Sequence, residues 1–457
     1  HFDPEKIDPG VVPNEETGTV DMNWKLETKS SDQIELSAGW GQTGVIGKLS
    51  LRFTNFSIRN IFRRDGVRRG IIPQGDGQTL SLSAQTNGKY YQSYSISFYD
   101  PWLGRKRPNS FSVSAFLSIQ TDVSSSYYNS AFYNNYNNYL YGYGNYNGGY
   151  GYNNMSSYYD PDKYIRMYGL SVGWGRRLRW PDDNFSFMAE LNYTLYSLKD
   201  WQYFIITDGK CNNINLSMTL SRNSVDHPIF PRSGSEFSLS AAFTPPYSMW
   251  DGKDYANLAN NPSSSTYQKE LQEKYSWIEY HKWKFKARTF TPLSNHNKCF
   301  VVMTRAEIGL LGSYNKHKPS PFENYYMGGD GMSGYSSLYS TETIGLRGYD
   351  DSSITPISSN GDYARAYNKY TLELRYPIVL QPASQIFALV FAEGGNAFQT
   401  IKKMNPFEVK RSAGVGVRLF LSVVGMLGLD WGYGFDVAPG TGKKGGSQLH
   451  FMIGQTF

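Results

Sequence analysis

The side chains that could catalyse a reaction are few and scattered in this chain. No Gly-x-Ser-x-Gly motif is present to expose a nucleophilic serine on a strand-to-helix turn. Two cysteines, Cys211 and Cys299, are too few for a disulfide framework or a cysteine-rich metal site. The histidines follow no metal-ligand spacing; they are His1, His227, His281, His296, His317 and His450. We therefore expect a protein that is not an enzyme and that uses no metal or other cofactor.

Two glycine-rich segments match nucleotide-binding loops only in part. Gly329, Gly331 and Gly334 have a Gly-x-Gly-x-x-Gly spacing, but the buried strand that precedes such a loop in dinucleotide-binding folds is missing. The segment PGTGKKGG, around Lys443, lacks the first glycine of a P-loop and the Ser or Thr that follows its Gly-Lys pair. Both segments are predicted to be loops.

The composition indicates a wall between two environments. Aromatic residues reach 16%, with 37 tyrosines, while charged residues are only 18%. The mean hydropathy is nevertheless -0.50, which fits strands whose alternate residues face lipid and a wet interior. No apolar run is long enough for a transmembrane helix, and the first residues, HFDPEKIDPG, lack a signal-peptide core, so an export signal would precede this sequence. The mild net charge of +6 gives no reason to expect nucleic acid as a partner.

Strict alternation of apolar and polar residues recurs along the chain and is typical of β-strands. In Asn213 to Ser221, Ile, Leu and Met alternate with Asn, Ser and Thr. Tyr370 to Tyr376 and His281 to Phe290 repeat the pattern, the latter with Trp283 and Phe285 between lysines. Periodicity does not say which face is inside, so a soluble β-sandwich with an apolar core is the alternative to a membrane barrel.

Long strands, aromatic residues at strand ends, and connections that alternate between short and long favour the membrane barrel. We predict an all-β, antiparallel transmembrane barrel of about 16 strands. The long connections 122–162, 246–275 and 315–367 would be extracellular loops, and Cys211 and Cys299 would lie at opposite rims, too far apart for a disulfide. The strands are expected to begin near Gln33, Gly44, Gln78, Tyr90, Ser110, Tyr164, Phe185, Asn212, Ser235, Trp277, Cys299, Lys369, Gln385, Val409, Met426 and Ser447.

The segment Tyr127 to Asn154 consists largely of Tyr, Asn and Gly. This composition favours a flexible surface loop, and the alternative is a docking site for a partner or a glycan.

Four motifs in order resemble one family of outer-membrane barrels. The segment GLRGYD (Gly345 to Asp350) is similar to the loop-six signature of the superfamily that contains BamA, TamA, FhaC and the organellar Sam and Toc channels. It comes after PIFPRSGSEFSLS (Pro228 to Ser240) and YYMGGDGMSG, and before a last strand that ends in LHFMIGQTF. The resemblance spans Gln33 to Phe457 and is closest to the BamA branch, with the Tyr- and Asn-rich insertion marking a divergent member.

The resemblance also suggests a domain organisation. Residues 1–30, which include the segment TGTVDMNWKLE, resemble the end of the last POTRA module, the periplasmic repeat that precedes such barrels. The chain would then be a piece of a longer protein, and residues 31–457 would form the barrel.

In that family loop six folds back into the lumen, where its arginine pairs with acidic residues of the wall. The resemblance therefore implies Glu373 and Glu393 as lumen partners of Arg347. The alternation around Glu373 places it on the inner face, whereas Glu393 shares its parity with apolar residues and could face either way. The loop-six site would consist of Gly345, Leu346, Arg347, Gly348, Tyr349 and Asp350.

A second site implied by the resemblance is the lateral seam between the first strand, Gln33 to Trp40, and the last, Ser447 to Phe457. Unpaired strand edges there could template the pairing of another strand. The alternative is an ordinary last strand whose terminal aromatic residue is recognised during its own assembly. The seam residues would be Gln33, Ile34, Leu36, Ala38, Trp40, Leu449, Phe451, Ile453, Gly454 and Phe457.

The function implied by the resemblance is the insertion of β-barrel proteins into the bacterial outer membrane. The expected partners are outer-membrane lipid and lipopolysaccharide, nascent β-barrel clients and accessory lipoproteins. Two alternatives are a passive pore or receptor and an FhaC-like translocation channel. The basic row from Lys282 to Arg288 is compatible with the channel.

Overall fold

The alternating segments form one antiparallel sheet of sixteen strands, each paired with the sheet strand that follows it, so the predicted barrel is confirmed. The computed structural model describes residues 8–14, 18–25, 33–41, 44–61, 73–86, 91–104, 109–123, 159–201, 204–296, 298–329, 342–356, 363–381, 384–421 and 425–453. The sheet strands are β3 (Gln33–Gly41), β4 (Gly44–Phe56), β5 (Gln78–Thr86), β6 (Tyr91–Asp100), β7 (Asn109–Val123), β8 (Tyr159–Arg177), β9 (Phe185–Lys199), β10 (Gly209–Asn223), β11 (Gly234–Phe243), β12 (His281–Pro292), β13 (Val301–Gly312), β16 (Ala366–Leu380), β17 (Ser384–Phe398), β18 (Lys410–Leu421), β19 (Gly425–Val437) and β20 (Lys444–Ile453).

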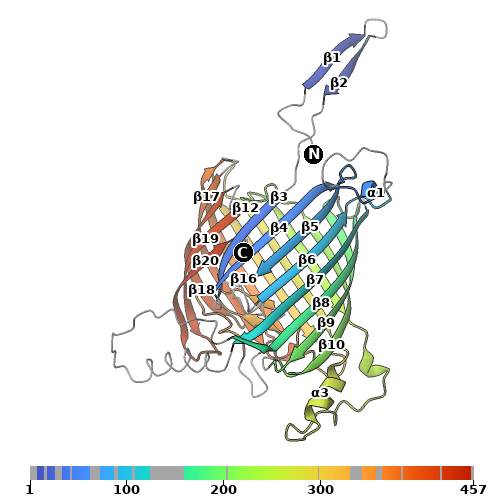
Figure 1. The fold of residues 1–457 in the computed structure, drawn as a ribbon. Coiled ribbons are helices and arrows are strands. Elements are labelled where there is room, and N and C mark those ends of the chain that lie inside the picture. Colours follow the sequence, from blue (N-terminus) through green and yellow to red (C-terminus); the bar gives the residue numbers. More distant parts are fainter. Residues whose placement is uncertain are drawn as a thin grey trace.

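The apolar set of each strand faces outward, which excludes the soluble sandwich. On β8, Leu170, Val172 and Trp174 keep 48%, 40% and 40% of their surface exposed. On β10, by contrast, Asn213 and Asn215 are buried inside the barrel. An outer wall of exposed Leu, Val and Trp suits a hydrocarbon solvent rather than water. Figure 1 shows the sheet curled around a lumen.

Two strand starts differ from the prediction by more than three residues. β8 begins at Tyr159 rather than near Tyr164, and β12 begins at His281 rather than near Trp277. The Tyr280 carbonyl still accepts the Thr244 N–H just beyond the end of β11, at 3.1 Å, but Ile278 does not continue this pairing. Instead, the Ile278 N–H donates to the Asn212 carbonyl, 2.8 Å away, so this segment lies against β10.

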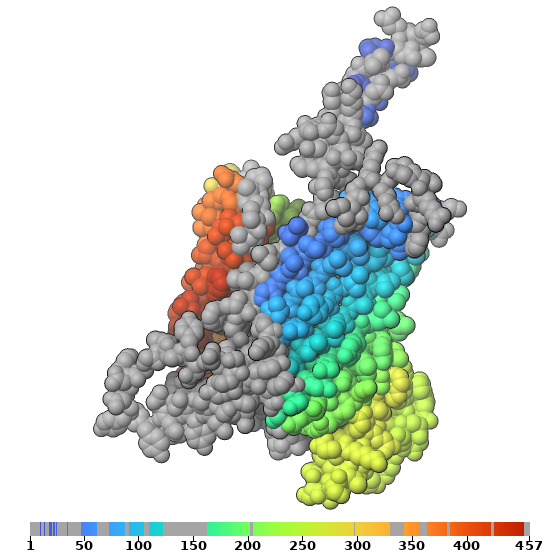
Figure 2. Space-filling view, in the orientation of Figure 1, coloured from blue at the N-terminus to red at the C-terminus, as the bar shows by residue number. Residues whose placement is uncertain are grey.

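The long connections carry elements that the alternation did not reveal. Between β11 and β12 lie a short 3-10 helix, η3 (Tyr247–Met249), and a helix, α3 (Tyr267–Tyr275). α3 is too short to show a helical period, but its Gln, Lys, Glu and Leu residues favour a helix. Figure 2 shows this connection projecting beyond the rim of the barrel. Other short elements are α1 (Ile58–Ile61), η4 (Ile401–Lys403), β14 (Tyr325–Met327) and β15 (Glu342–Ile344).

The N-terminal residues form a separate antiparallel hairpin of β1 (Asp8–Asn14) and β2 (Thr19–Lys25). Figure 1 places this hairpin at one end of the barrel, together with α1, and α3 at the other end. We refer to these as the hairpin end and the α3 end. The assignment of residues 1–30 to a POTRA module stays a prediction, and Tyr127 to Asn154 lie outside the described residues. Among the described residues, no helix is long and apolar enough to cross a membrane.

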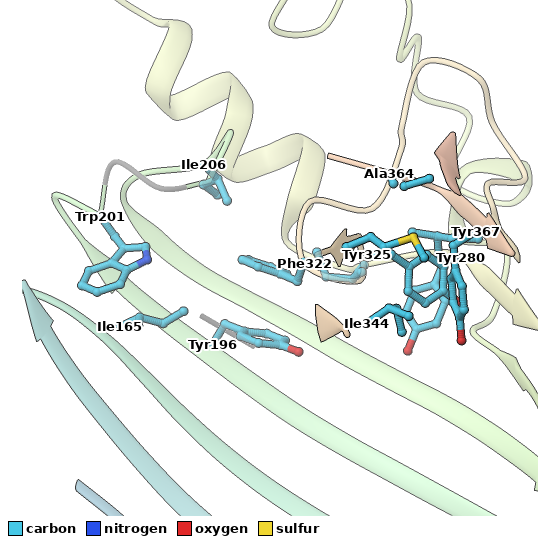
Figure 3. Close-up of a cluster of buried hydrophobic side chains, with 14 of the residues drawn as sticks. Ile165, Tyr196, Trp201, Ile206, Tyr280, Phe322, Tyr325, Ile344, Ala364 and Tyr367 are labelled. Atoms are coloured by element: carbon cyan, nitrogen blue, oxygen red, sulfur yellow. The ribbon is translucent and has the colours of Figure 1, made fainter. Parts of the chain in front are cut away.

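The interior contains two apolar clusters as well as polar residues. One lies at the hairpin end, where Phe387, Leu389 and Phe391 point inward together with Glu393. The turn after β10 folds into the lumen there, so that the rings of Phe230 and Phe387 lie 5.1 Å apart. The other cluster fills the α3 end and contains Trp201, Phe322 and Tyr325 (Figure 3). Cys211 and Cys299 are both free and buried, one in each cluster.

Candidate functional site

The connection between β13 and β16 turns back into the barrel. β14 and β15 pair in parallel, and a bridge between Gly329 and Leu346 brings the chain to the loop-six motif. Leu346, Arg347 and Tyr349 are completely buried, while Asp350 is exposed. A buried arginine must be paired to be tolerated in such a place, and the wall strands supply the partners.

Arg347 is held by three carboxylates from three strands. Its Nη2 lies 2.7 Å from both Glu373 Oε1 and Glu393 Oε1, and its Nη1 lies 3.0 Å from Asp430 Oδ2. The backbone N–H of Arg347 also donates to Glu393 Oε2 at 3.1 Å. On one side the Phe391 ring lies 3.6 Å from the guanidinium carbon. Burial alone would lower the pKa of Arg347, but attraction by Glu393 and Glu373 outweighs it and raises this pKa.

Asp430 is the partner that was missing from the prediction. It lies on β19 between Leu429 and Trp431, which face outward with about half of their surface exposed. The alternation in this strand therefore already marked Asp430 as an inward carboxylate. The resemblance pointed only to the strands that carry Glu373 and Glu393, now identified as β16 and β17.

Three further cations surround these carboxylates. Arg375 Nε donates to Glu373 at 2.8 Å, and Arg418 Nη2 lies 2.8 Å from Asp430. Lys369 lies 3.6 Å from Glu393. Each carboxylate thus holds Arg347 and one cation from the wall, so the network ties loop six to β16, β17, β18 and β19. We call these seven residues the arginine cage: Arg347, Lys369, Glu373, Arg375, Glu393, Arg418 and Asp430.

Gly348 brings the loop backbone directly against the wall. Its φ of +86° is a left-handed conformation that favours glycine. Its N–H donates to His450 Nε2 on β20, at 2.8 Å. A Cβ on Gly434 would lie 2.3 Å from the Gly348 carbonyl oxygen, and a Cβ on Gly445 would lie equally close to it. Glycines in the wall therefore make the space in which the loop backbone sits.

Tyr349 and Asp350 complete the contact with the last strands. The Tyr349 hydroxyl donates to the Arg411 carbonyl at 2.7 Å and accepts the Asp436 N–H at 3.2 Å. Asp350 Oδ1 accepts a hydrogen bond from Gln448 Nε2 on β20, at 3.0 Å. Neither His450 nor Gln448 was predicted as a site residue, although both lie on the last strand beside the predicted seam residues Leu449 and Phe451.

Replacing Tyr349 with phenylalanine is expected to lower the free energy of unfolding by about 1 to 2 kcal/mol, because the Arg411 carbonyl and the Asp436 N–H each lose a hydrogen bond to the hydroxyl group of this buried side chain. Urea unfolding of the barrel in lipid vesicles measures this change. Tyr433→Phe is the control, because Tyr433 lies on the outer face and is 40% exposed. Equal free energies of unfolding for the two variants would contradict these hydrogen bonds of the Tyr349 hydroxyl.

The predicted seam residues lie on the two strands that end the order of the sheet. In the described part of the chain, β3 pairs with β4, and β20 pairs with β19. Ile34, Leu449 and Phe451 are exposed by 77%, 71% and 54%. Gln33, Leu36, Ala38 and Trp40 belong to β3, and Ile453 to β20. Gly454 and Phe457 lie outside the described residues.

Among the residues that the structure describes, no three His, Cys, Asp or Glu side chains come together as metal ligands. The carboxylates that do converge are those of the arginine cage, where cations of the protein already occupy the space between them.

Comparison with known proteins agrees with this geometry. The model of the Omp85 superfamily domain matches residues 74–457. The fold is similar to that of BamA from Haemophilus ducreyi lacking POTRA domains 1-3, with 17% sequence identity, a TM-score of 0.58, and coverage of 98% of this chain and 74% of that one. It is also similar to CdiB from Escherichia coli, with 10% identity, a TM-score of 0.50, and coverage of 98% and 67%. No curated protein sequence matches the chain significantly. Because the family model matches most of the chain, this protein belongs to the Omp85 superfamily.

Proposed function

We propose that this protein inserts β-barrel proteins into the bacterial outer membrane through the lateral seam between β3 and β20. The observation that carries the proposal is the attachment of loop six to β19 and β20 from inside the barrel. Arg347 is bonded to Asp430 on β19, and Gly348 is bonded to His450 on β20. The loop thus supports one edge of the seam from the lumen.

The seam offers what a client strand needs. An edge strand presents a row of backbone N–H and C=O groups that another strand can pair with. Ile34, Leu449 and Phe451 would keep a client in contact with the membrane, because all three are exposed. The reaction would need no bond chemistry, since one set of ladder hydrogen bonds replaces another.

In this proposal the hairpin end faces the periplasm and the α3 end faces outward. Residues 1–30 would continue into POTRA modules, to which accessory lipoproteins bind. Lipid and lipopolysaccharide would contact the outer face of the wall, where Leu, Val and Trp are exposed.

A passive pore is disfavoured by the apolar cluster at the α3 end. Its members come from several connections: Trp201 and Ile206 follow β9, Ile278 precedes β12, and Phe322 follows β13. In Figure 3, Phe322 lies between the side chains on the wall strands and those of loop six. The rings of Phe322 and Tyr196 stack at 4.2 Å. Apolar side chains packed in this way differ from the polar, water-filled interior that a passive pore needs.

A translocation channel is the second candidate, and CdiB is a structural neighbour. The basic row on β12 was the residue pattern compatible with it. However, Lys282 and Lys284 lie 3.2 and 2.6 Å from Glu342 of β15, and Lys286 lies 3.7 Å from Glu307. These lysines are paired with residues of the protein itself, which favours insertion over translocation.

A disulfide between β3 and β20 is expected to abolish client insertion, because a closed ladder offers no edge to a client strand. Cysteines would be introduced pairwise along the two strands in a Cys211→Ala, Cys299→Ala background, and client folding would be followed in liposomes before and after reduction. The control is a disulfide between Leu51→Cys and Leu82→Cys, which are partners on β4 and β5. Full activity of the oxidised seam variant would overturn the proposal, as would steady ion conductance without client folding.

A further inference from the structure

At the hairpin end, a cavity inside the barrel combines cationic and aromatic walls. Its volume is about 290 Å³, close to the lower end of small-ligand sites, which begin at about 300 Å³. Three arginines line it, namely Arg288, Arg375 and Arg418, against one carboxylate, Glu236. The remaining lining is mainly apolar and includes Phe290 and Phe387.

Two of the three arginines are buried in the wall of this cavity. Arg375 and Arg418 are more than nine-tenths buried. The guanidinium carbon of Arg375 lies 5.5 Å from the Phe290 ring centre and 5.7 Å from that of Phe387, a distance at which cations are attracted to ring faces. A guanidinium carries five N–H donors. Among the described residues, the hydrogen bonds of Arg375 with Glu373 use Nε and Nη2, so its Nη1 group remains for a ligand.

We infer that this cavity binds an amphipathic carboxylate, in which a carboxylate is joined to one aromatic or branched apolar group. A carboxylate matches the planar donor fork of an arginine, and the apolar part of the ligand would lie on Phe290 and Phe387. The volume limits the apolar part to about one side chain. Two sources have this chemistry: a free small acid and the C-terminal residue of a peptide that reaches the barrel from the hairpin end.

This site is distinct from the seam, so the inference does not rest on the proposed function. It does share Arg375 and Arg418 with the arginine cage, where Glu373 pairs with both Arg375 and Arg347, and Asp430 pairs with both Arg418 and Arg347. Substituting Arg375 or Arg418 would therefore also disturb loop six. The cavity is therefore better tested by substituting lining residues outside the arginine cage with larger side chains.

Ile229 lines the cavity from the turn after β10 and is half-buried, so Ile229→Trp should fill the cavity while keeping all three arginines. Val225→Trp provides a second variant in the same turn. Leu293→Trp is the control, because Leu293 lies in another turn at the same end, is 60% exposed and does not line the cavity.

The probe is N-acetylphenylalanine, whose binding to the full chain in detergent micelles would be measured by saturation-transfer NMR. We expect binding by the wild type and by Leu293→Trp, and its loss in Ile229→Trp and Val225→Trp. N-acetylphenylalaninamide should bind about tenfold more weakly, because it lacks the charge that strengthens hydrogen bonds to arginine. Equal binding of acid and amide, no binding of the acid, or unchanged binding by both filled variants would overturn the inference. A peptide with a free C-terminal phenylalanine that binds more tightly than the acid assigns the site to chain ends, and equal or weaker binding assigns it to small acids.

Discussion

Replacing Arg347 with alanine is expected to lower the free energy of unfolding of the barrel by about 3 kcal/mol, the lower end of the range for a broken buried ion pair. Arg347 and its three carboxylate partners are dry, with at most 1% of each side chain exposed. The variant loses the hydrogen bonds to Glu373, Glu393 and Asp430 and leaves a void beside Phe391. The loss stays at the lower end because each carboxylate keeps one wall cation.

Urea unfolding in lipid vesicles would measure this loss, and Arg411→Ala supplies the matched control. Arg411 also pairs with a carboxylate, Asp436, at 2.9 Å, but its side chain is 67% exposed. An exposed pair is worth about 0 to 1 kcal/mol. Arg347→Lys should fall between the two, because an ammonium group lacks the planar fork that reaches several carboxylates at once. If Arg347→Ala and Arg411→Ala lost the same stability, the arginine cage would not hold loop six.

Substituting Gly434 with alanine should unseat loop six without removing any of its charges. The added Cβ would lie 2.3 Å from the Gly348 carbonyl oxygen and 3.0 Å from the Gly445 Cα, so it meets backbone that cannot rotate away. Overpacking of this kind costs about 1 to 3 kcal/mol. That cost corresponds to a rise of about tenfold to a hundredfold in the population of the unseated loop.

A thiol in the buried part of the loop reports this change. Leu346→Cys, in a background without Cys211 and Cys299, should react at least about tenfold faster with a soluble maleimide when Gly434 is alanine. Leu346 is completely buried in the seated loop. Gly47→Ala is the control, because a Cβ on this glycine of β4 would meet only Thr86 O, at 3.9 Å. If the thiol of Leu346→Cys reacted equally fast with and without Gly434→Ala, the added methyl group would be accommodated by movement of the wall, and loop six would stay in place.

The wall of the barrel could be predicted from the sequence because one physical constraint acts on every strand. Lipid on one face and the interior on the other impose alternation on each strand, so strand starts such as Gln33, Gly44, Gln78 and Phe185 agree with the structure. The same parity placed Glu373 inside. It could not decide Glu393, because the interior at the hairpin end is apolar and Phe387, Leu389 and Phe391 share its face.

The parts that escaped prediction depend on contacts between distant segments. The bond from Gly348 to His450 joins residues 102 positions apart, and nothing local to either residue signals it. α3 forms in a connection where no ladder imposes a period, and its buried face packs on residues of other connections. Asp430 is different, because the alternation of β19 alone places it on the inner face. It was not predicted because the resemblance implied only Glu373 and Glu393 as partners of Arg347.

The glycines that receive loop six also affect how the wall can deform. Gly414 and Gly416 on β18, and Gly432 and Gly434 on β19, leave part of the inner face without side chains, and the backbone of loop six at Gly348 packs against Gly432 and Gly434. Because glycine weakens a strand, we expect this part of the wall to bend more easily when the loop is absent than when the loop is bound in the lumen. Loop six would then set the resistance to bending of the wall beside the seam. Release of loop six would soften that side of the barrel, while the opposite side keeps its curvature.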